Sequence, residues 1–285
     1  LNSKVIPAID KDKLMNRIDG KIAIITGSTQ GLGQAIAHQF AQAGAAGIVI
    51  TGRNRARGEK VASDIASQYG IKTHFVAAEL DQIDQVRNIV AETDQQFGRI
   101  DLLVNAAGLT DRGNLLNTTP ELFDQMFAIN TKAPFFLMQE SVKVMIREKI
   151  KGAIINIGSM SEHAGQPFLS PYCASKGALA TLTRNSGYAL LRNQIRVNQL
   201  DIGWMNSDHE RSLIAQETGD DTFMDRKAAT LPAGRILQTD EVARAVLWMA
   251  SDDSGMMTGS VIQFDQTIWG AYDDASLPDK PIEEM

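Results

Sequence analysis

The sequence has a single cysteine, no long apolar run and no excess of positive charge. Cys173 alone cannot form an intrachain disulfide or hold a cluster that needs several thiolates. No apolar run approaches the roughly 20 residues of a bilayer-crossing helix, and residues 1–20 mix charges unlike a signal peptide. The net charge of −6 argues against a basic surface for nucleic acid. These absences predict a cytoplasmic globular protein that binds neither nucleic acid nor membrane.

What the 285 residues do contain is a repeated pattern of short apolar runs and longer amphipathic stretches. The apolar runs are 22–25, 48–50, 73–77, 102–104, 153–157, 195–200 and 261–264. The amphipathic stretches include 32–43, 56–69, 83–97 and 121–149. The runs are short and mostly lack in/out alternation, which is typical of strands covered on both faces. This pattern predicts an α/β fold with a parallel sheet of about seven strands and helices on both faces.

Because no Pro- or Ser-rich linker divides the chain, we expect a single domain over residues 1–285. Three segments depart from the strand–helix rhythm. Residues 1–20 form an N-terminal extension, and the polar excursion 204–234 is predicted to be a substrate lid, since long insertions of this kind are usually functional. The acidic tail 271–285 is predicted to be a surface segment or a contact with a neighbouring subunit.

A glycine-rich turn follows the first apolar run and opens the next amphipathic stretch. It reads Thr26-Gly27-Ser28-Thr29-Gln30-Gly31-Leu32-Gly33. Glycines allow the backbone to approach a pyrophosphate closely, and the helix N-terminus supplies free N–H donors and the positive end of the helix dipole. Three glycines are weak evidence alone, but the strand before and the helix after them predict a dinucleotide site.

The spacing of these glycines resembles that of the short-chain dehydrogenase/reductase family. Further segments agree with this family in order and spacing from about residue 21 to 264. They are Asn105-Ala106-Ala107-Gly108 after the fourth run, Asn130, Ser159, and Tyr172 with Lys176. The resemblance implies a Rossmann-type doubly wound sheet and cofactor contacts from residues 27–33 and 105–108. It also implies a homotetramer or homodimer with the helices 121–149 and 172–191 at the interface.

The end of the second run indicates which dinucleotide binds. An acidic residue there would bond the ribose 2′-hydroxyl, whereas an arginine accommodates a 2′-phosphate. The sequence has Gly52 and Arg53 and no acid, so NADP(H) is favoured and NAD(H) remains possible. The alternative for Arg53 is a solvated residue that begins the next helix. By resemblance, Glu79 and Leu80 lie near the adenine.

Tyr172 and Lys176 are four residues apart and would share one face of a helix. Tyr172 is the only one of the four tyrosines with a lysine at this spacing. A phenol with a pKa of about 10 is a poor base, and a fixed positive charge lowers that pKa. We therefore expect Tyr172 to act as a general acid/base assisted by Lys176, which would also hold the nicotinamide ribose. The alternative is an ordinary helix residue beside a surface lysine.

Ser159 is expected to donate a hydrogen bond to the substrate carbonyl oxygen and to stabilise the developing oxyanion. By resemblance, Asn130 anchors a water that passes protons onward from Lys176; the alternative is a buried amide at a helix irregularity. The family commonly has Pro-Gly and then a Thr after the sixth strand. This chain has Ile202, Gly203 and Ser207 there, and we expect Gly203 and Ser207 to contact the nicotinamide.

His163 and Trp204 are predicted to line the substrate mouth together with Ser159 and Tyr172. None of the four histidines has metal-ligand spacing, so no metal is expected. The predicted activity is interconversion of a secondary alcohol and a ketone by hydride transfer, on a small polyol, sugar or hydroxy ketone. Apolar residues near the site keep an apolar ketone open as a second substrate class. A catalytically silent nucleotide sensor, and an isomerase or dehydratase that uses the cofactor transiently, are two further candidate functions.

Overall fold

Seven strands form one parallel sheet in the computed structural model, which describes residues 15–163, 166–266, 281 and 284. The strands are β1 (Ile22–Ile25), β2 (Gly47–Gly52), β3 (Lys72–Ala77), β4 (Leu102–Asn105), β5 (Ala153–Ser159), β6 (Arg196–Ile202) and β9 (Val261–Phe264). Their order across the sheet is β3-β2-β1-β4-β5-β6-β9, and every neighbouring pair is parallel. The predicted fold class, a Rossmann-type doubly wound sheet, is confirmed.

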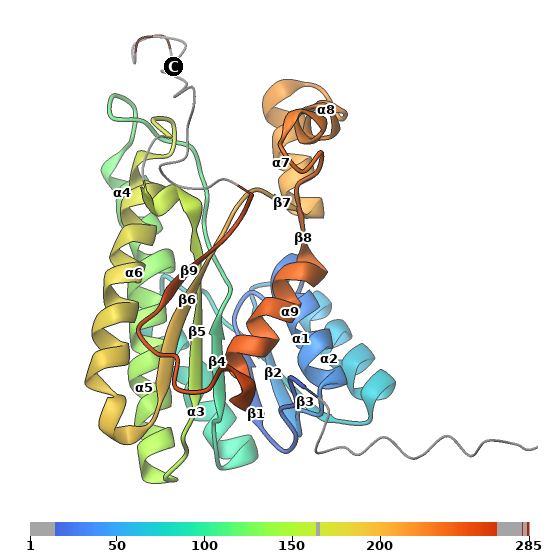
Figure 1. The fold of residues 1–285 in the computed structure, drawn as a ribbon, viewed down its shortest axis with the longest axis vertical. Coiled ribbons are helices and arrows are strands. Elements are labelled where there is room, and N and C mark those ends of the chain that lie inside the picture. The colour runs from blue at the N-terminus through green and yellow to red at the C-terminus, as the bar shows by residue number, and fades with distance from the viewer. Residues whose placement is uncertain (1–14, 164–165, 267–280, 282–283, 285) are drawn as a thin grey trace, which may run out of the picture.

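Helices cover both faces of this sheet (Figure 1). One face carries α1 (Gly31–Gln42), α2 (Arg55–Tyr69) and α9 (Thr239–Ala250), and the other carries α3 (Ile83–Phe97), α5 (Ala133–Arg147) and α6 (Ser170–Ala189). The helix expected over 121–149 is in fact α4 (Pro120–Phe127), a π-helical turn (Ala128–Lys132) and α5. Such single-turn irregularities are frequent at functional sites.

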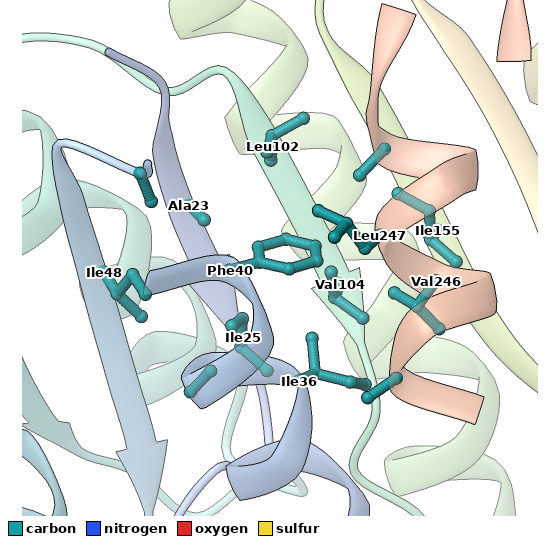
Figure 2. Close-up of a cluster of buried hydrophobic side chains, with 14 of the residues drawn as sticks. Ala23, Ile25, Ile36, Phe40, Ile48, Leu102, Val104, Ile155, Val246 and Leu247 are labelled. Atoms are coloured by element: carbon teal, nitrogen blue, oxygen red, sulfur yellow. The ribbon is translucent and has the colours of Figure 1, made fainter. Parts of the chain in front are cut away.

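The core lies in two layers, one on each side of the sheet. Strands such as β1 and β4 are buried over their whole length, which explains why they read as continuous apolar runs. Figure 2 shows the layer between the sheet and α1 and α9, where Phe40 packs among Ile25, Val104 and Leu247. Phe40 is fully buried and is one of the largest such side chains among the described residues.

The strand order reverses direction at β1. From β1 the chain runs outward through β2 and β3, then returns to place β4 on the other side of β1. The connections after β1 and β4 therefore lead to opposite faces and leave a crevice at the carboxyl ends of these strands, where open α/β sheets bind their ligands. The glycine-rich turn follows β1, so the topology places it at this crevice.

Residues 204–234 rise beyond the carboxyl ends of the strands (Figure 1). They contain β7 (Met205–Asn206), α7 (Asp208–Thr218) and α8 (Phe223–Thr230), and β7 pairs with β8 (Leu237–Gln238). Ile214, Met224 and Ile236 form a small hydrophobic cluster of their own. The segment therefore has its own packing, and its role as a substrate lid stays a prediction.

The two other segments that depart from the rhythm fall largely outside the described residues. Of the N-terminal extension 1–20, only residues 15–20 are described, and of the acidic tail 271–285, only 281 and 284 are. Across the described part of the chain, no helix combines the length and the apolar character that a bilayer crossing requires.

Candidate active site

The glycine-rich turn has a backbone conformation and close contacts that leave no room for side chains at its glycine positions. Gly27 has φ +63°, and a Cβ there would lie 2.9 Å from the Cα of Ala107. A Cβ on Gly33 would overlap the carbonyl of Gly27. Gly31 has φ +54°, in the left-handed region that favours glycine. The turn therefore folds tightly against the residues that follow β4.

The N-terminus of α1 opens directly from this turn. Gln30 is the N-cap, its side chain forms no capping hydrogen bond, and the first turn carries no acidic residue. The first N–H groups of a helix have no intrahelical partner, and the dipole places partial positive charge there. This end of α1 fits the pyrophosphate of a dinucleotide, since the donors and the charge are both present and the glycines leave space.

Thr26 joins the glycine-rich turn to the turn after β4. Its Oγ1 accepts hydrogen bonds from the backbone N–H groups of Ala106 (3.0 Å) and Ala107 (3.1 Å). Asn105 donates through Nδ2 to Asn156 Oδ1 on β5 at 2.8 Å. Ser28 in turn accepts a hydrogen bond from the N–H of Thr51 at 3.0 Å, which ties the turn to β2. The predicted cofactor segments 27–33 and 105–108 are thus held side by side.

Arg53 lies just beyond β2, is exposed, and forms no hydrogen bond or ion pair with any described residue. Arg57, which the sequence patterns did not single out, lies one helical turn further on and donates to Gln30 Oε1 of the glycine-rich turn. Asn54 caps α2 by accepting from the Arg57 N–H at 2.9 Å. Two guanidinium groups therefore stand near the point where a 2′-phosphate is expected. The signal available in the sequence was the i, i+4 spacing of the two arginines.

Glu79 and Leu80, expected near the adenine, follow β3 at the edge of the sheet. Glu79 is exposed, and its backbone N–H donates to Gln85 Oε1 at 2.8 Å. Leu80 is half-buried against the core layer below α3. Their contact with adenine stays a prediction.

Ser159, Tyr172 and Lys176 converge at the carboxyl end of β5. Ser159 is the last residue of β5; its Oγ accepts a hydrogen bond from the Ser161 N–H at 3.1 Å and lies close enough to the Tyr172 phenol to favour its ionised form. Lys176 is only 4% exposed, and its Nζ donates to the carbonyl of Ile157 at 2.8 Å. The same Nζ lies 5.7 Å from the centre of the Tyr172 ring. The i, i+4 spacing on α6 thus does bring the phenol and the ammonium to one place.

The protonation of these two groups differs from the expectation. Burial raises the pKa of Tyr172 to about 12, although the hydrogen bond from Ser159 acts in the opposite direction. Burial also lowers the pKa of Lys176 to about 8. The expected lowering of the phenol pKa is therefore not observed here, because desolvation of the phenolate outweighs the favourable contacts. Near neutral pH this site holds the proton on Tyr172.

Asn130 lies in the π-helical turn and is buried. Its Oδ1 accepts from the N–H of Leu109 at 2.8 Å, and its Nδ2 donates to the carbonyl of Leu109 at 2.9 Å and to Ser175 Oγ at 3.0 Å. A Cβ on Gly108 would lie 3.6 Å from Asn130 Oδ1 and 3.7 Å from Lys176 Nζ. Asn130 therefore joins the turn after β4 to α6, and its part in a proton relay stays a prediction.

Residues 203–207 lead from β6 into α7. Ser207 caps α7 by accepting from the Glu210 N–H at 3.2 Å, and Trp204 donates through Nε1 to Glu210 Oε1 at 2.9 Å. A Cβ on Gly203 would overlap the carboxylate of Asp265, so glycine is required for this packing. The segment expected to contact the nicotinamide and the substrate is thus braced against the first turn of α7.

His163 ends a short turn after β5 (Met160–His163) and is partly exposed. Its Nε2 lies 3.2 Å from Gln263 Nε2 and 3.8 Å from Asp201 Oδ2. Beside it are two buried carboxyl groups that the sequence patterns did not single out, Glu162 and Asp201. Asp201 is an acidic residue near the carboxyl end of β6, a position that was the signal available in the sequence.

Comparison with known proteins agrees with this geometry. A family model described as enoyl-(acyl carrier protein) reductase matches residues 27–266. The chain belongs to the short-chain dehydrogenase/reductase family. The match spans the glycine-rich turn, the strand ends and α7, which are the parts that form the candidate active site.

Three relatives indicate the range of this family. The chain is 30% identical to galactitol 2-dehydrogenase from Agrobacterium fabrum over 89% of this chain and 99% of that protein. It is 32% identical to the 3-oxoacyl-[acyl-carrier-protein] reductase FabG of Thermotoga maritima over 87% and 98% of the two chains. The structure of a gluconate 5-dehydrogenase from Burkholderia cenocepacia, in complex with NADP and tartrate, matches with a TM-score of 0.79 and 32% identity, over 88% and 95%.

Gly33→Ala is expected to weaken NADPH binding at least about 10-fold, because the added methyl group overlaps the Gly27 carbonyl and displaces the turn. The measurement is a titration of NADPH fluorescence. Gly70→Ala is the control for backbone strain alone, since Gly70 has φ +69°, which alanine rarely adopts, but lies at the end of α2 remote from the glycine-rich turn. An unchanged affinity in Gly33→Ala would show that the turn does not contact the cofactor.

Proposed function

We propose that this protein is an NADP(H)-dependent oxidoreductase that interconverts a secondary alcohol and a ketone. The observation that supports the proposal most is the buried group formed by Ser159, Tyr172 and Lys176 at the crevice end of β5. Membership of a family of oxidoreductases agrees with it. A catalytically silent nucleotide sensor would not need this complete set.

When bound, a nicotinamide cofactor supplies or accepts the hydride. In the direction of reduction, Tyr172 donates its proton to the carbonyl oxygen, and Ser159 donates a hydrogen bond to the same oxygen. The raised pKa of Tyr172 keeps that proton available at neutral pH. Lys176, when charged, stabilises the phenolate that remains, and Asn130 holds the turn beside it.

The preference for NADP(H) is argued from Arg53 and Arg57, with NAD(H) as the second choice. Neither residue at the end of β2 is acidic, and Arg53 is exposed. A guanidinium presents several donors in one plane and suits a phosphate group. The NADP complex of the related gluconate 5-dehydrogenase is consistent with this choice.

The proposed substrate is a small neutral polyol, sugar or hydroxy ketone. Burial is the main cause of the raised pKa of Tyr172, and the carboxylates of Glu210 and Asp201 raise it further, so two carboxylates lie near enough to act on the phenol. Carboxylates accept hydrogen bonds from hydroxyl groups and repel anions. The relationship to galactitol 2-dehydrogenase agrees with a polyol. The half-exposed ring of Phe168, which packs against Arg112, supports the second candidate, an apolar ketone.

We also propose that the protein forms a homodimer or homotetramer through α4, α5 and α6. Exposed aromatic side chains gather on these helices, namely Phe123, Phe135 and Tyr188. An apolar groove lined by Phe127, Phe136 and Leu182 lies on the same side. Its cytoplasmic location stays a prediction.

Tyr172→Phe is expected to lower kcat by about 10²–10⁴-fold, because the proton donor is removed. NADPH affinity should stay within about twofold of wild type, since the ring and its packing remain. Tyr69→Phe is the matched control, because Tyr69 is the last residue of α2, outside the candidate active site and the proposed subunit interface. Near-normal turnover in Tyr172→Phe would exclude Tyr172 as the proton donor.

Arg53→Ala is expected to lower kcat/KM for NADPH at least about 10-fold while leaving the value for NADH nearly unchanged, because a charge-assisted contact to phosphate is lost. Arg55→Ala is the control, since Arg55 is exposed nearby but pairs with Glu59 at 3.1 Å. Equal losses with both cofactors would contradict the proposed phosphate contact.

A substrate panel tests the charge argument. With NADPH or NADP in excess, neutral polyols, ketoses and hydroxy ketones should give a higher kcat/KM than sugar acids of equal size, since the carboxylates repel anions. Initial rates followed at the NADPH absorbance suffice. Turnover of apolar ketones alone would favour the second candidate, and product formation without net NADPH consumption would point to an isomerase or dehydratase.

A further inference from the structure

Glu162 and Asp201 form a buried pair of carboxyl groups beside the catalytic group. Asp201 on β6 is completely buried, and the side chain of Glu162 is 5% exposed. An oxygen of one carboxyl group lies within 4.8 Å of an oxygen of the other. Gly158 of β5 lies opposite Asp201 in the sheet, and a Cβ there would overlap the Asp201 carboxylate. The strand therefore has a glycine where the pair needs space.

The hydrogen bonds around the pair leave one position that requires a proton. Gln199 Nε2 donates to Glu162 Oε2 at 2.7 Å and to Asp201 Oδ1 at 2.8 Å, which uses both of its N–H donors. Asp201 Oδ2 is buried and accepts from no N–H group of the described residues. Two ionised carboxylates in contact would repel each other, and neither could donate. A single proton held between Glu162 and Asp201 satisfies this contact.

One ligand atom from each of Glu162, His163 and Asp201 lies within 4.8 Å of the other two, a spacing that a cation would also tolerate. The Gln199 amide, however, directs its hydrogens toward both carboxyl groups. Its Oε1 lies 3.2 Å from the Thr183 hydroxyl, which agrees with this orientation of the amide. Donors directed into the group favour a shared proton.

The pair and Lys176 flank the same end of β5. Lys176 Nζ is bonded to the carbonyl of Ile157, the residue before Gly158. A Cβ on Gly177, the residue after Lys176, would lie 3.9 Å from the carbonyl oxygen of Glu162. Five titratable or charged groups face the pair from the elements packed against it. They are His163 of the same turn, three residues of α6 (Tyr172, Lys176 and the partly exposed Arg184), and Glu210 of α7, whose charge acts on Tyr172.

The charge states agree with this arrangement. Burial, with the Asp201 carboxylate, raises the pKa of Glu162 to about 8, and burial raises the pKa of Asp201. Burial lowers the pKa of Lys176, whereas Asp201 and Glu162 raise it. Negative charge on the pair therefore opposes the loss of the ammonium proton.

We propose that Glu162 and Asp201 are positioning residues that share one proton and hold a single negative charge beside Lys176, which keeps the Lys176 ammonium charged during the reaction. This proposal rests on the proposed function, because it assigns Lys176 a part in turnover. The pair keeps one carboxylate at neutral pH without the repulsion of two buried charges.

The variants differ in the negative charge that remains on the Glu162–Asp201 pair. In Glu162→Gln or Asp201→Asn, the remaining carboxyl group ionises more readily since its acidic neighbour is gone, so one negative charge remains. In the double variant E162Q/D201N none remains. The double variant E59Q/D64N is the control, because it removes two exposed carboxyl groups of α2, a helix on the opposite face of the sheet from α6.

The first measurement is kcat for ketone reduction as a function of pH. Both single variants should keep the alkaline limb within a few tenths of a pH unit of wild type. E162Q/D201N should move that limb to lower pH by about one unit, because Lys176 loses its proton more easily. E59Q/D64N should leave the alkaline limb in place. An unmoved limb in E162Q/D201N would reduce the pair to a packing role and overturn the proposal.

The second measurement is Tm as a function of pH, which needs no substrate. Because the pKa of Glu162 is raised from 4.5 to about 8, the folded protein binds an extra proton between these values and loses stability as pH rises through this window. The Tm of Glu162→Gln relative to wild type should therefore increase from pH 5 to pH 9. If the difference in Tm between Glu162→Gln and wild type did not depend on pH, the proposal of a shared proton would be overturned.

Two further outcomes are informative. A rise in wild-type Tm on addition of MgCl2 or MnCl2 that Glu162→Gln abolishes would show that a cation joins the carboxyl groups, which overturns the proposal. Absence of turnover by wild type on every ketone would refute the proposed function and, with it, the assistance to Lys176. The pH-dependent Tm difference would persist in that case, so the two failures are distinguishable.

Discussion

The candidate active site is built around a lysine ammonium group that is held almost entirely out of water. Burial of a charge is costly unless hydrogen bonds and opposite charges offset it. Lys176 is 4% exposed and has the Ile157 carbonyl at 2.8 Å. The negative charge of Asp201 and Glu162 raises its pKa against the effect of burial. The surrounding residues supply the hydrogen bond and the negative charge that stabilise this buried cation beside Tyr172.

The sheet topology explains how so few residues suffice. Parallel strands end at the same edge, so the ends of β1, β4, β5 and β6 bring the glycine-rich turn, Asn105, Ser159 and Asp201 to one side of the molecule. Hydrogen bonds then fix the turns relative to one another, with Thr26 joining the first to the second. The rigid strands place the polar groups, while the long connection 204–234 rises over them.

Departures from the family pattern lie mainly on the substrate side of this edge. Ile202 replaces the usual proline, yet Gly203 remains and packs against Asp265. Trp204 and Ser207 are both bonded to Glu210 in the first turn of α7. The residues expected to carry the chemistry therefore lie on β5, α6 and the π-helical turn, whereas the departures from the family pattern lie between β6 and α7.

Local sequence patterns were enough to predict the fold class, which the structure confirms, and to propose most residues of the candidate site. Apolar runs such as 22–25 and 102–104 fall within β1 and β4, because strands buried on both faces carry few polar residues. The glycine spacing and the Tyr172–Lys176 spacing were local patterns, and the structure places both as expected. Only the tertiary structure decided the protonation of Tyr172, the contact of Arg57 with Gln30, and the pairing of Glu162 with Asp201. Burial and contacts between distant segments depend on how the strands are ordered in space, and no local pattern in the chain encodes that order.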